Sequence, residues 1–197
     1  MLHLMSWNIN QQRAPWQKLV NSDADVALLQ EAKPPPSELI PPIEVDQSPW
    51  RIAGISNRPW RAAIARFSNR VTMRPHKLGA IGTARLDELA VSRMGTLVVA
   101  DITVHATGEV ITVASMYGAW EEPVKDIKSS WIYADASVHR LISDLSALIG
   151  RQRGHKIIAA GDLNILYGYG EYKSPYWKDR YDTVFASITF DRTLRIA

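Results

Sequence analysis

The most constraining feature of this sequence is a set of short apolar runs that each end beside an amide or carboxylate side chain. The run 2–9 ends next to Asn8, and the run 25–31 ends in a glutamate. A later run, 155–161, is followed at once by Asp162. Short apolar runs of this kind are typical of buried strands. Strand ends in layered α/β folds open onto a shared crevice, so we expect these polar ends to converge.

Between these runs the pattern alternates between strands and helices. Apolar residues at helical spacing predict three helices, over 14–22, 131–149 and 176–187. Shorter apolar runs predict four further strands, over 62–67, 71–74, 96–105 and 109–117, of which the last two form a hairpin. The proline-rich stretch 34–42 predicts a loop. The alternating residues 187–197 are either a final strand or a chance alternation. We predict one α/β domain, 1–197, with a mixed sheet.

The amino-acid composition limits which class of protein this chain can be and which residues could bind a metal. The chain has no cysteine, which excludes disulfides, thiolate nucleophiles and Cys-ligated metals. Any metal must therefore bind to carboxylate, amide or imidazole groups. No apolar run reaches the roughly 18–20 residues that a membrane span needs, and the N-terminus has no signal-peptide pattern. We expect a cytoplasmic protein.

Positive charge is concentrated in one segment. Residues 47–86 contain no Asp or Glu, whereas acidic residues outnumber basic ones in the rest of the chain. The segment's eight basic residues are Arg51, Arg58, Arg61, Arg66, Arg70, Arg74, Lys77 and Arg85. One interpretation is a solvated arginine-rich surface. The other is a patch that faces a polyanion, because clustered arginines bind phosphates through paired hydrogen bonds. On the second interpretation, Arg58, Arg61 and Arg66 are candidate contacts for a substrate phosphate.

The order of these motifs resembles the endonuclease/exonuclease/phosphatase superfamily, which has the deoxyribonuclease I-like fold. The matching segments, in the order of that family, are MSWNIN (5–10), VALLQEA (26–32), VASMYGA (113–119) and AAGDLNI (159–165). The resemblance spans residues 2 to about 165. It implies a four-layer αββα sandwich and the hydrolysis of phosphate esters with a divalent metal, Mg²⁺ or Mn²⁺.

The resemblance also implies roles for individual residues. Glu31 is similar to the glutamate that ligates the metal, and Asn8 to the asparagine that helps to hold the metal and its network. Asp162 resembles the aspartate that orients or deprotonates the attacking water, and Asn164 the amide that stabilises the phosphate. Tyr117 matches a strand-end position from which Tyr or His contacts phosphate. In-line attack on phosphorus needs a positioned water, neutralised phosphate oxygens and hydrogen-bond donors, which these residue types can supply.

One part of the family pattern has no match. Members carry a late catalytic histidine in an S-D-H-like motif, and none of the five histidines of this chain can be given that role. We therefore expect a fold that is incomplete at its C-terminal end. We expect the chain to be either a truncated or frameshifted product, or a divergent member without the final motif.

Three functions follow from these observations. The leading hypothesis is a metal-dependent phosphodiesterase, with nucleic acid as its substrate and binding partner. The same core supports a phosphatase of small or lipid-like phosphate esters, because a fold does not choose a substrate. The third alternative is a non-catalytic remnant that binds nucleic acid or another polyanion. The oligomeric state stays open.

Overall fold

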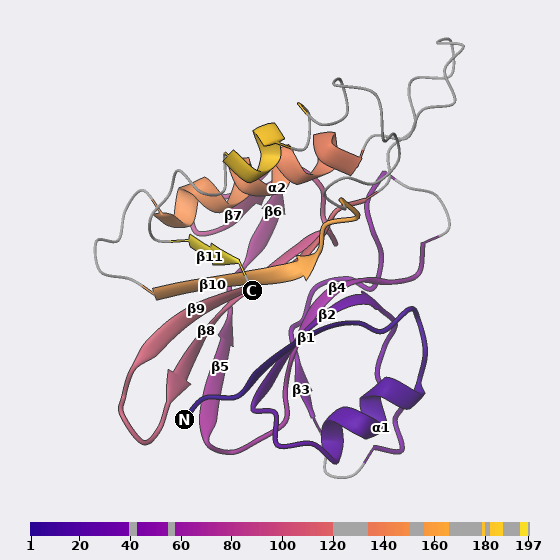
Figure 1. The fold of residues 1–197 in the computed structure, drawn as a ribbon, viewed down its shortest axis with the longest axis vertical. Coiled ribbons are helices and arrows are strands. Elements are labelled where there is room, and N and C mark those ends of the chain that lie inside the picture. Colours follow the sequence, from indigo (N-terminus) through magenta and orange to yellow (C-terminus); the bar gives the residue numbers. More distant parts are fainter. Residues whose placement is uncertain are drawn as a thin grey trace.

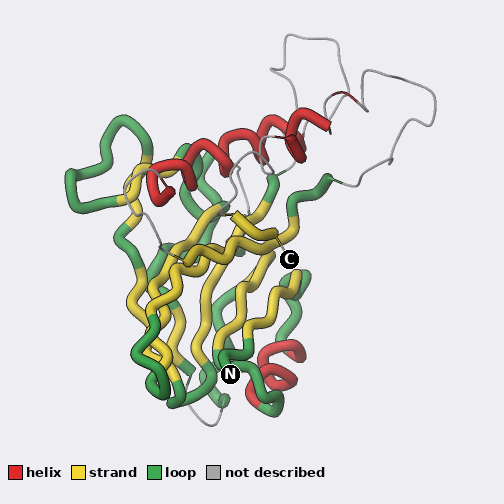
Figure 2. The backbone as a smooth tube through the Cα atoms, turned by 60° about the vertical axis from the view of Figure 1, so that its left-hand side comes forward, coloured by secondary structure: helices red, strands yellow, loops and turns green. Residues whose placement is uncertain are grey.

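In the computed structural model, two β-sheets pack face to face and a helix covers the outer face of each (Figure 1). The side view in Figure 2 shows the long helix against one sheet and the short helix against the other. The structure describes residues 1–39, 43–54, 58–119, 134–149, 156–165, 179, 182–186 and 194–196. The four layers are those of the αββα sandwich that the family resemblance implies, with two main sheets where the residue pattern alone predicts one mixed sheet.

The first sheet has the order β1-β2-β4-β3. Its strands are β1 (Leu4–Asn8), β2 (Val26–Ala32), β3 (Glu44–Val45) and β4 (Arg61–Arg66). β1 and β2 are parallel, and β4 is antiparallel to β2 and β3. Helix α1 (Ala14–Val20) has Pro15 in its first turn, where a missing N–H costs nothing. It buries Trp16 and Leu19 against the outer face of this sheet.

The second sheet has the order β11-β10-β9-β8-β5. Its strands are β5 (Val71–Pro75), β8 (Leu97–Val104), β9 (Val110–Tyr117), β10 (Lys156–Asp162) and β11 (Leu194–Ile196). β8 and β9 form an antiparallel hairpin, whereas β9, β10 and β11 are parallel. Helix α2 (Ala134–Ile149) buries Leu141 and Leu145 against the outer face of this sheet. A separate parallel pair consists of β6 (Leu78–Ala80) and β7 (Leu89–Val91).

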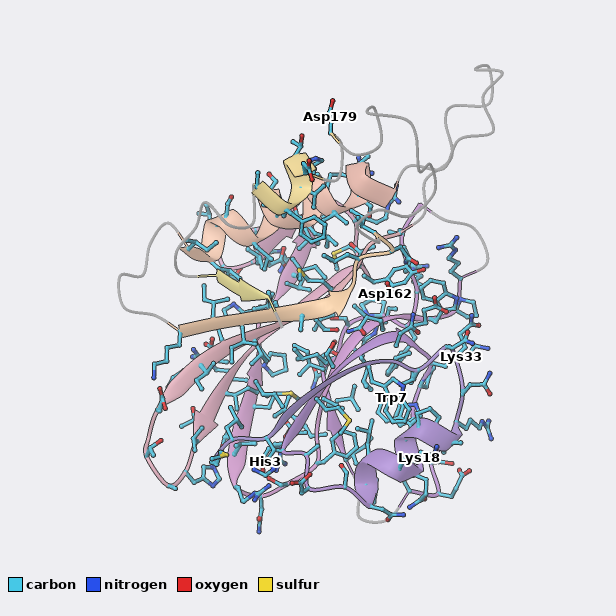
Figure 3. The ribbon with its side chains drawn as sticks, in the orientation of Figure 1. His3, Trp7, Lys18, Lys33, Asp162 and Asp179 are labelled. Atoms are coloured by element: carbon cyan, nitrogen blue, oxygen red, sulfur yellow. The ribbon has the colours of Figure 1, made fainter. Side chains whose placement is uncertain are left out.

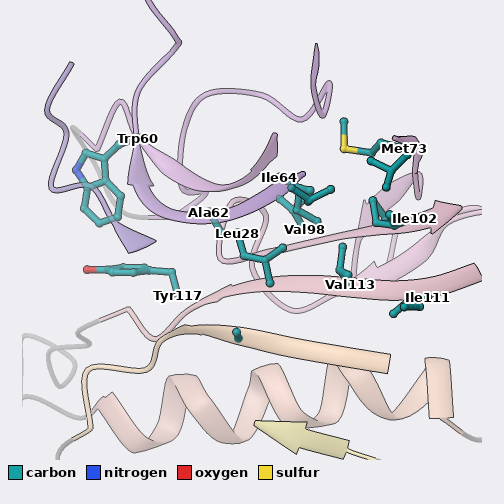
Figure 4. Packing of buried hydrophobic residues seen from close by; sticks show 14 of the residues in the cluster. Leu28, Trp60, Ala62, Ile64, Met73, Val98, Ile102, Ile111, Val113 and Tyr117 are labelled. Atoms are coloured by element: carbon teal, nitrogen blue, oxygen red, sulfur yellow. The ribbon is translucent and has the colours of Figure 1, made fainter. Parts of the chain in front are cut away.

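The core between the sheets runs from an aliphatic end to an aromatic end. Figure 4 shows Met73, Ile102 and Ile111 at one end of this cluster, and Trp60 above Tyr117 at the other. The two rings meet edge to face, with centroids 4.9 Å apart and planes at 88°. Edge-to-face pairing of this kind is a favourable aromatic geometry. The aromatic pair closes the core at the end where β9 stops.

Most predicted elements are confirmed to within two residues at each described end. The first helix, the hairpin and the three polar-ended strands are all present. The sequence does not predict β3, β6 or β7, because elements of two or three residues are too short to show a periodicity. The final alternating run contains β11, which settles its described part as a strand. Residues 131–133, with which the predicted long helix begins, lie outside the described residues. So does most of the predicted helix 176–187.

None of the helices in the described part of the chain is long and apolar enough to cross a bilayer.

Candidate active site

The polar ends of three strands meet at one end of the sandwich. Asn8 ends β1, and its Nδ2 donates to Asp162 Oδ2 at 2.7 Å, although the two residues are 154 positions apart. The same nitrogen lies 3.5 Å from Glu31 Oε1 near the end of β2. Figure 3 shows Asp162 beside the tip of the β10 arrow, well apart from His3. The structure therefore brings together the three strand-end residues that the sequence singles out.

Strand direction explains this convergence. β1 and β2 are parallel, as are β9 and β10, so each pair presents its carboxyl ends at a single edge. The turn after β9 joins the second pair, because Gly118 N–H donates to Asp162 O at 2.7 Å. A Cβ at Gly118 would collide with the carbonyl of Leu163, so this close approach requires glycine.

A β-bulge aims Glu31 into the site. Leu29 pairs with Ala63 and Ala32 pairs with Arg61, so two residues of β2 face one residue of β4. Leu29 and Ala32 both pack in the outer cluster under α1, and strict alternation between them would turn Glu31 toward that outer side. Instead Glu31 has a φ of +49°, which is uncommon for a residue with a Cβ. The bulge turns its carboxylate toward Asn8 and Tyr117.

A buried hydrogen-bond network between the two sheets anchors this bulge. Gln30 is 1% exposed, and its Nε2 donates to Ser115 Oγ on β9 at 3.2 Å and to Leu28 O at 3.0 Å. Ser115 Oγ donates in turn to Leu29 O at 2.9 Å. These bonds tie the residues before Glu31 to the strand that carries Tyr117. Buried polar networks of this kind rigidify a local geometry when every member is satisfied.

The amide of Asn8 faces both carboxylates with its NH₂ group. Its Oδ1 accepts the backbone N–H of Asn10 at 2.9 Å, so its nitrogen is turned toward Asp162 and Glu31. The other oxygen of Asp162 accepts the backbone N–H of Asn164 at 2.9 Å. Asn8 in this geometry therefore positions two carboxylates of like charge beside one another.

Asn164 and Tyr117 lie beside these carboxylates. Asn164 has a φ of +52°, which asparagine tolerates better than most residues, and its Nδ2 donates to Gly118 O at 2.8 Å. The hydroxyl of Tyr117 lies 3.4 Å from Glu31 Oε1. Burial, followed by the negative charge of Glu31, raises the pKa of Tyr117 to about 12. The phenol therefore stays protonated at neutral pH and can act as a hydrogen-bond donor.

These residues surround an open depression of about 400 Å³. Its lining residues are Gln11, Glu31, Arg58, Trp60, Tyr117 and Asn164. The guanidinium carbon of Arg58 lies 5.2 Å from the centroid of the Trp60 ring, which is within the range of a cation–π interaction. The depression thus combines a carboxylate, a phenol, an amide and a cation on one surface.

Two of the three predicted phosphate contacts lie elsewhere, and that prediction is corrected. Arg61 is fully buried, donates to Asp46 Oδ2 at 2.8 Å and stacks at 4.1 Å on Trp50. Arg66 donates to Glu44 at 2.6 Å and to Ser68 O at 2.7 Å. Both guanidinium groups are therefore committed to internal partners, and of the three only Arg58 lines the depression.

Most cations of the basic segment are neutralised by nearby acidic residues. Five of its eight cations form ion pairs with acidic residues brought in from other parts of the chain. These pairs are Arg61–Asp46, Arg66–Glu44, Arg70–Asp25, Arg74–Asp101 and Lys77–Asp87. Most of the positive charge that is contiguous in the sequence is therefore paired with carboxylates of the same chain. It does not form one unpaired anion-binding face.

The described histidines take no part in the lining of the depression. His3 pairs with Asp23, His76 with Asp101, and His105 with Thr72. His139 lies on α2 and is half-buried. The remaining histidine, at position 155, lies outside the described residues.

Glu31 is the carboxylate best placed to bind a cation. Its side-chain contacts are the long ones to Asn8 and Tyr117, and no Lys, Arg or His of the described residues forms an ion pair with it. Within those residues, no three His, Asp or Glu side chains cluster as a metal site. Mg²⁺ and Mn²⁺ suit such a site, because they take one or two carboxylates and keep several waters. Asp162, which contacts the same Asn8 nitrogen as Glu31, is a second carboxylate near such a cation.

Four residues of the site lie outside the sequence prediction. Gln11 lines the depression, with a φ of +60° and its N–H on Glu31 O at 2.9 Å. Trp60 supports Arg58 and Tyr117, and Gln30 and Ser115 anchor the bulge. The sequence offers a signal for Trp60 alone, as an aromatic residue within the basic segment. The others depend on contacts between strands that are distant in the chain.

The fold and the site together define a protein of the deoxyribonuclease I-like class. The model of the Endonuclease/Exonuclease/phosphatase family matches residues 5–196, and the chain belongs to this family. It is therefore of the phosphodiester hydrolase kind.

Two solved structures share its fold. The human Nocturnin catalytic domain with bound sulfate anion matches with a TM-score of 0.52, and the AP endonuclease LMAP of Leishmania major with 0.55. Each is 14% identical to this chain, and each match covers 98% of this chain and 69% of the other. A search of curated proteins found no significant match.

Proposed function

We propose that this protein is a phosphodiesterase that requires a divalent metal and hydrolyses nucleic acid. The observation that carries the proposal is the Asn8 amide set between the carboxylates of Glu31 and Asp162. Two carboxylates close together repel one another, and a cation bound between them relieves that repulsion. No ion pair from the described protein residues supplies it, which supports a metal ion at this place.

Each side chain has a role that its contacts support. Glu31 would hold Mg²⁺ or Mn²⁺, and a bound metal neutralises the non-bridging oxygens of a phosphodiester. Asp162, fixed by Asn8 and by the Asn164 N–H, orients the attacking water. Tyr117 is a protonated donor toward the phosphate, and the amide of Asn164, which also hydrogen-bonds this phenol, would contact the phosphate beside it. Donors aimed at the charge that develops on phosphate oxygens stabilise the transition state.

Arg58 supports a phosphodiester substrate over an uncharged one. Its guanidinium lies against Trp60 at the depression, so its position is defined before a substrate arrives. Preorganisation lowers the entropic cost of binding. A guanidinium is also suited to paired hydrogen bonds with phosphate oxygens.

The test compares Glu31→Gln with Glu38→Gln, an exposed glutamate on the loop after β2. Plasmid DNA, RNA and bis(p-nitrophenyl) phosphate are each incubated with Mg²⁺, with Mn²⁺ and with EDTA. We expect metal-dependent cleavage that Glu31→Gln lowers at least about 100-fold, at the upper end of what loss of a metal's supporting group costs. Thermal unfolding with and without Mg²⁺ gives a second readout, because a cation that binds the folded state raises Tm.

The control variant should keep both the cleavage and the Mg²⁺-dependent rise in Tm. Cleavage in EDTA, or full activity of Glu31→Gln, would overturn the role of Glu31. Turnover of inositol phosphates without turnover of nucleic acid would select the phosphatase alternative. Salt-dependent DNA binding without turnover in any metal would select the non-catalytic alternative.

A further inference from the structure

One residue of the depression holds a backbone conformation that its residue type rarely adopts. Gln11 has a φ of +60°, in the left-handed region that favours glycine. We propose that Gln11 is a specificity residue, whose side-chain amide hydrogen-bonds the nucleoside on one side of the scissile phosphate. The proposal rests on the proposed function, and it names the uncharged part of the substrate that the site would recognise.

The first argument is the strain at this position. In the described part of the chain, the non-glycine residues with positive φ are Asn10, Gln11, Glu31 and Asn164, and all of them lie in or next to the candidate active site. Strained residues of this kind cluster at sites where a functional contact offsets their cost. Asparagine tolerates positive φ better than most residues, and the bulge at Glu31 directs a carboxylate. Gln11 has neither reason, and glycine would be less strained in its place.

The second argument is the contrast between the main chain and the side chain of Gln11. Its N–H donates to Glu31 O at 2.9 Å, and the N–H of Gln12 donates to Ile9 O at 2.9 Å, so the backbone here is fixed. The side-chain amide of Gln11 forms no hydrogen bond with any of the residues that the structure describes. Gln11 is half-buried where it lines the depression. Its amide therefore keeps two donor hydrogens and an acceptor oxygen for a ligand.

The third argument is the place of Gln11 in the first sheet. The strand order is β1-β2-β4-β3; Gln11 follows β1, Glu31 lies in β2, and Arg58 precedes β4. Glu31 therefore lies between Gln11 and Arg58 along this edge of the sheet, and all three line the depression. A phosphate held at Glu31 would have a cation on its β4 side and an uncharged amide on its β1 side.

The chemistry of this arrangement matches a nucleoside on the β1 side. A phosphodiester of nucleic acid carries a nucleoside on each side of its phosphate, and the base edge of a nucleoside presents donors and acceptors next to one another. Glutamine pairs with such edges, because its amide also holds a donor and an acceptor side by side. A neutral amide is less suited than arginine to a second phosphate, so we assign Gln11 to the nucleoside.

The test compares Gln11→Ala with Gln12→Ala, a matched control at an exposed neighbour. The substrates are a single-stranded oligodeoxynucleotide and bis(p-nitrophenyl) phosphate, which has no nucleoside. Gln11→Ala should raise KM for the oligonucleotide about 10-fold, the cost of one lost amide–base pair. Its kcat, and both constants for the small diester, should stay within about 2-fold of wild type, because the contact is made equally in the ground and transition states.

Equal losses on both substrates would show that Gln11 acts through the backbone of Glu31, and would overturn the proposal. A KM for the oligonucleotide equal to that of Gln12→Ala would also overturn it. An oligonucleotide with an abasic site on either side of the cleaved bond provides a further check. The effect of Gln11→Ala should disappear when the contacted base is missing, and an effect that persists with both abasic substrates would contradict a base contact.

Binding of the oligonucleotide in EDTA separates this proposal from the proposed catalysis. Gln11→Ala should weaken binding about 10-fold without changing the slope of log affinity against log salt, because a neutral amide displaces no counterion. A smaller slope, or an affinity equal to that of Gln12→Ala, would overturn the proposal. If wild type cleaves neither substrate, the proposed catalysis fails, and this binding measurement still decides the role of Gln11.

Thermal unfolding tests the strain directly. Because alanine is strained at positive φ, Gln11→Gly should have a Tm about 2 °C higher than Gln11→Ala, although both variants lose the same affinity for the oligonucleotide. At position 12, where φ is not positive, glycine should instead have a lower Tm than alanine. A lower Tm for Gln11→Gly than for Gln11→Ala would remove the strain on which the proposal rests and would overturn it.

Discussion

The carboxylates of Asp101 and Glu31 differ in how many hydrogen bonds and ion pairs the protein supplies to them. Asp101, on β8, accepts hydrogen bonds from Thr112 at 2.6 Å, Arg74 at 2.6 Å and His76 at 3.0 Å. Burial alone would raise its pKa, but these three bonds outweigh burial and lower it to about 2. Glu31 has an amide and a phenol at long distance, and no cation of the described residues pairs with it.

The difference separates a carboxylate that holds the fold from one that faces a ligand. A saturated carboxylate has its lone pairs occupied, so its removal should be felt in stability. An unsaturated one keeps lone pairs and charge for an incoming group, so its removal should be felt in chemistry. The remaining predictions test this separation, beginning with the largest expected effect.

Asp101→Asn should lower the free energy of unfolding by about 2 kcal/mol and leave kcat unchanged. The loss is smaller than for a fully buried ion pair because the side chain of Arg74 is 81% exposed. The stabilisation from Asp101 is present above the unfolded pKa of 3.8 and disappears as pH falls through the folded pKa of about 2. Urea denaturation between pH 5 and pH 2 measures both effects.

The matched control is Asp87→Asn, which breaks the exposed pair with Lys77. Its unfolding curve should stay close to that of wild type, since exposed ion pairs contribute little. A fall in kcat for Asp101→Asn, without a fall in stability, would break the comparison between the two centres.

Gln30→Met should lower both stability and kcat. Gln30 is buried and both hydrogens of its amide are hydrogen-bonded, and it supports Glu31, whose carboxylate has only long contacts. We expect about 1 kcal/mol less stability from the lost hydrogen bonds. We also expect kcat to fall about 10-fold with KM unchanged, because the bulge that aims Glu31 loses its tie to Ser115. Urea denaturation and steady-state kinetics measure the two effects.

Ser115→Ala breaks the same network from the other strand and should reproduce the loss of kcat. Gln30→Glu keeps an acceptor but removes the donor and should not restore it. If Gln30→Met loses stability alone, Gln30 is a structural residue with no positioning role.

Tyr117→Phe should give the smallest effect, a fall in kcat of about 10-fold or less from one neutral hydrogen bond. Because the pKa of Tyr117 is raised to about 12, the phenol stays protonated at and well above neutral pH. The activity of wild type should therefore show no decline from Tyr117 ionisation between pH 7 and pH 10. A decline in that range that disappears in Tyr117→Phe would contradict the role of Tyr117 as a donor.

The sequence predicts the site residues that lie at the ends of strands. Asn8, Glu31, Tyr117, Asp162 and Asn164 each follow or end an apolar run, and the parallel strands bring them to one edge. Local pattern is enough for these residues because strand direction decides where a strand end lies.

The sequence does not predict what depends on contacts across the sandwich. The bulge at Glu31 needs the register between β2 and β4, and nothing in the letters LLQE reveals it. The basic segment looks like one surface until acids from outside it, such as Asp25 and Asp101, reach across to it.

The separation of 154 positions between Asn8 and Asp162 also bears on when the candidate site is assembled during synthesis of the chain. Chains emerge from the ribosome N-terminus first, and contacts between distant residues form late because they close long loops. β1 and β2 are neighbours in sequence and can pair early, so Asn8 and Glu31 come together first. Asp162 joins them only when β10 docks beside β9. A growing chain therefore brings Asn8 and Glu31 together before Asp162 has been made, and the second carboxylate joins them only after β10 has docked.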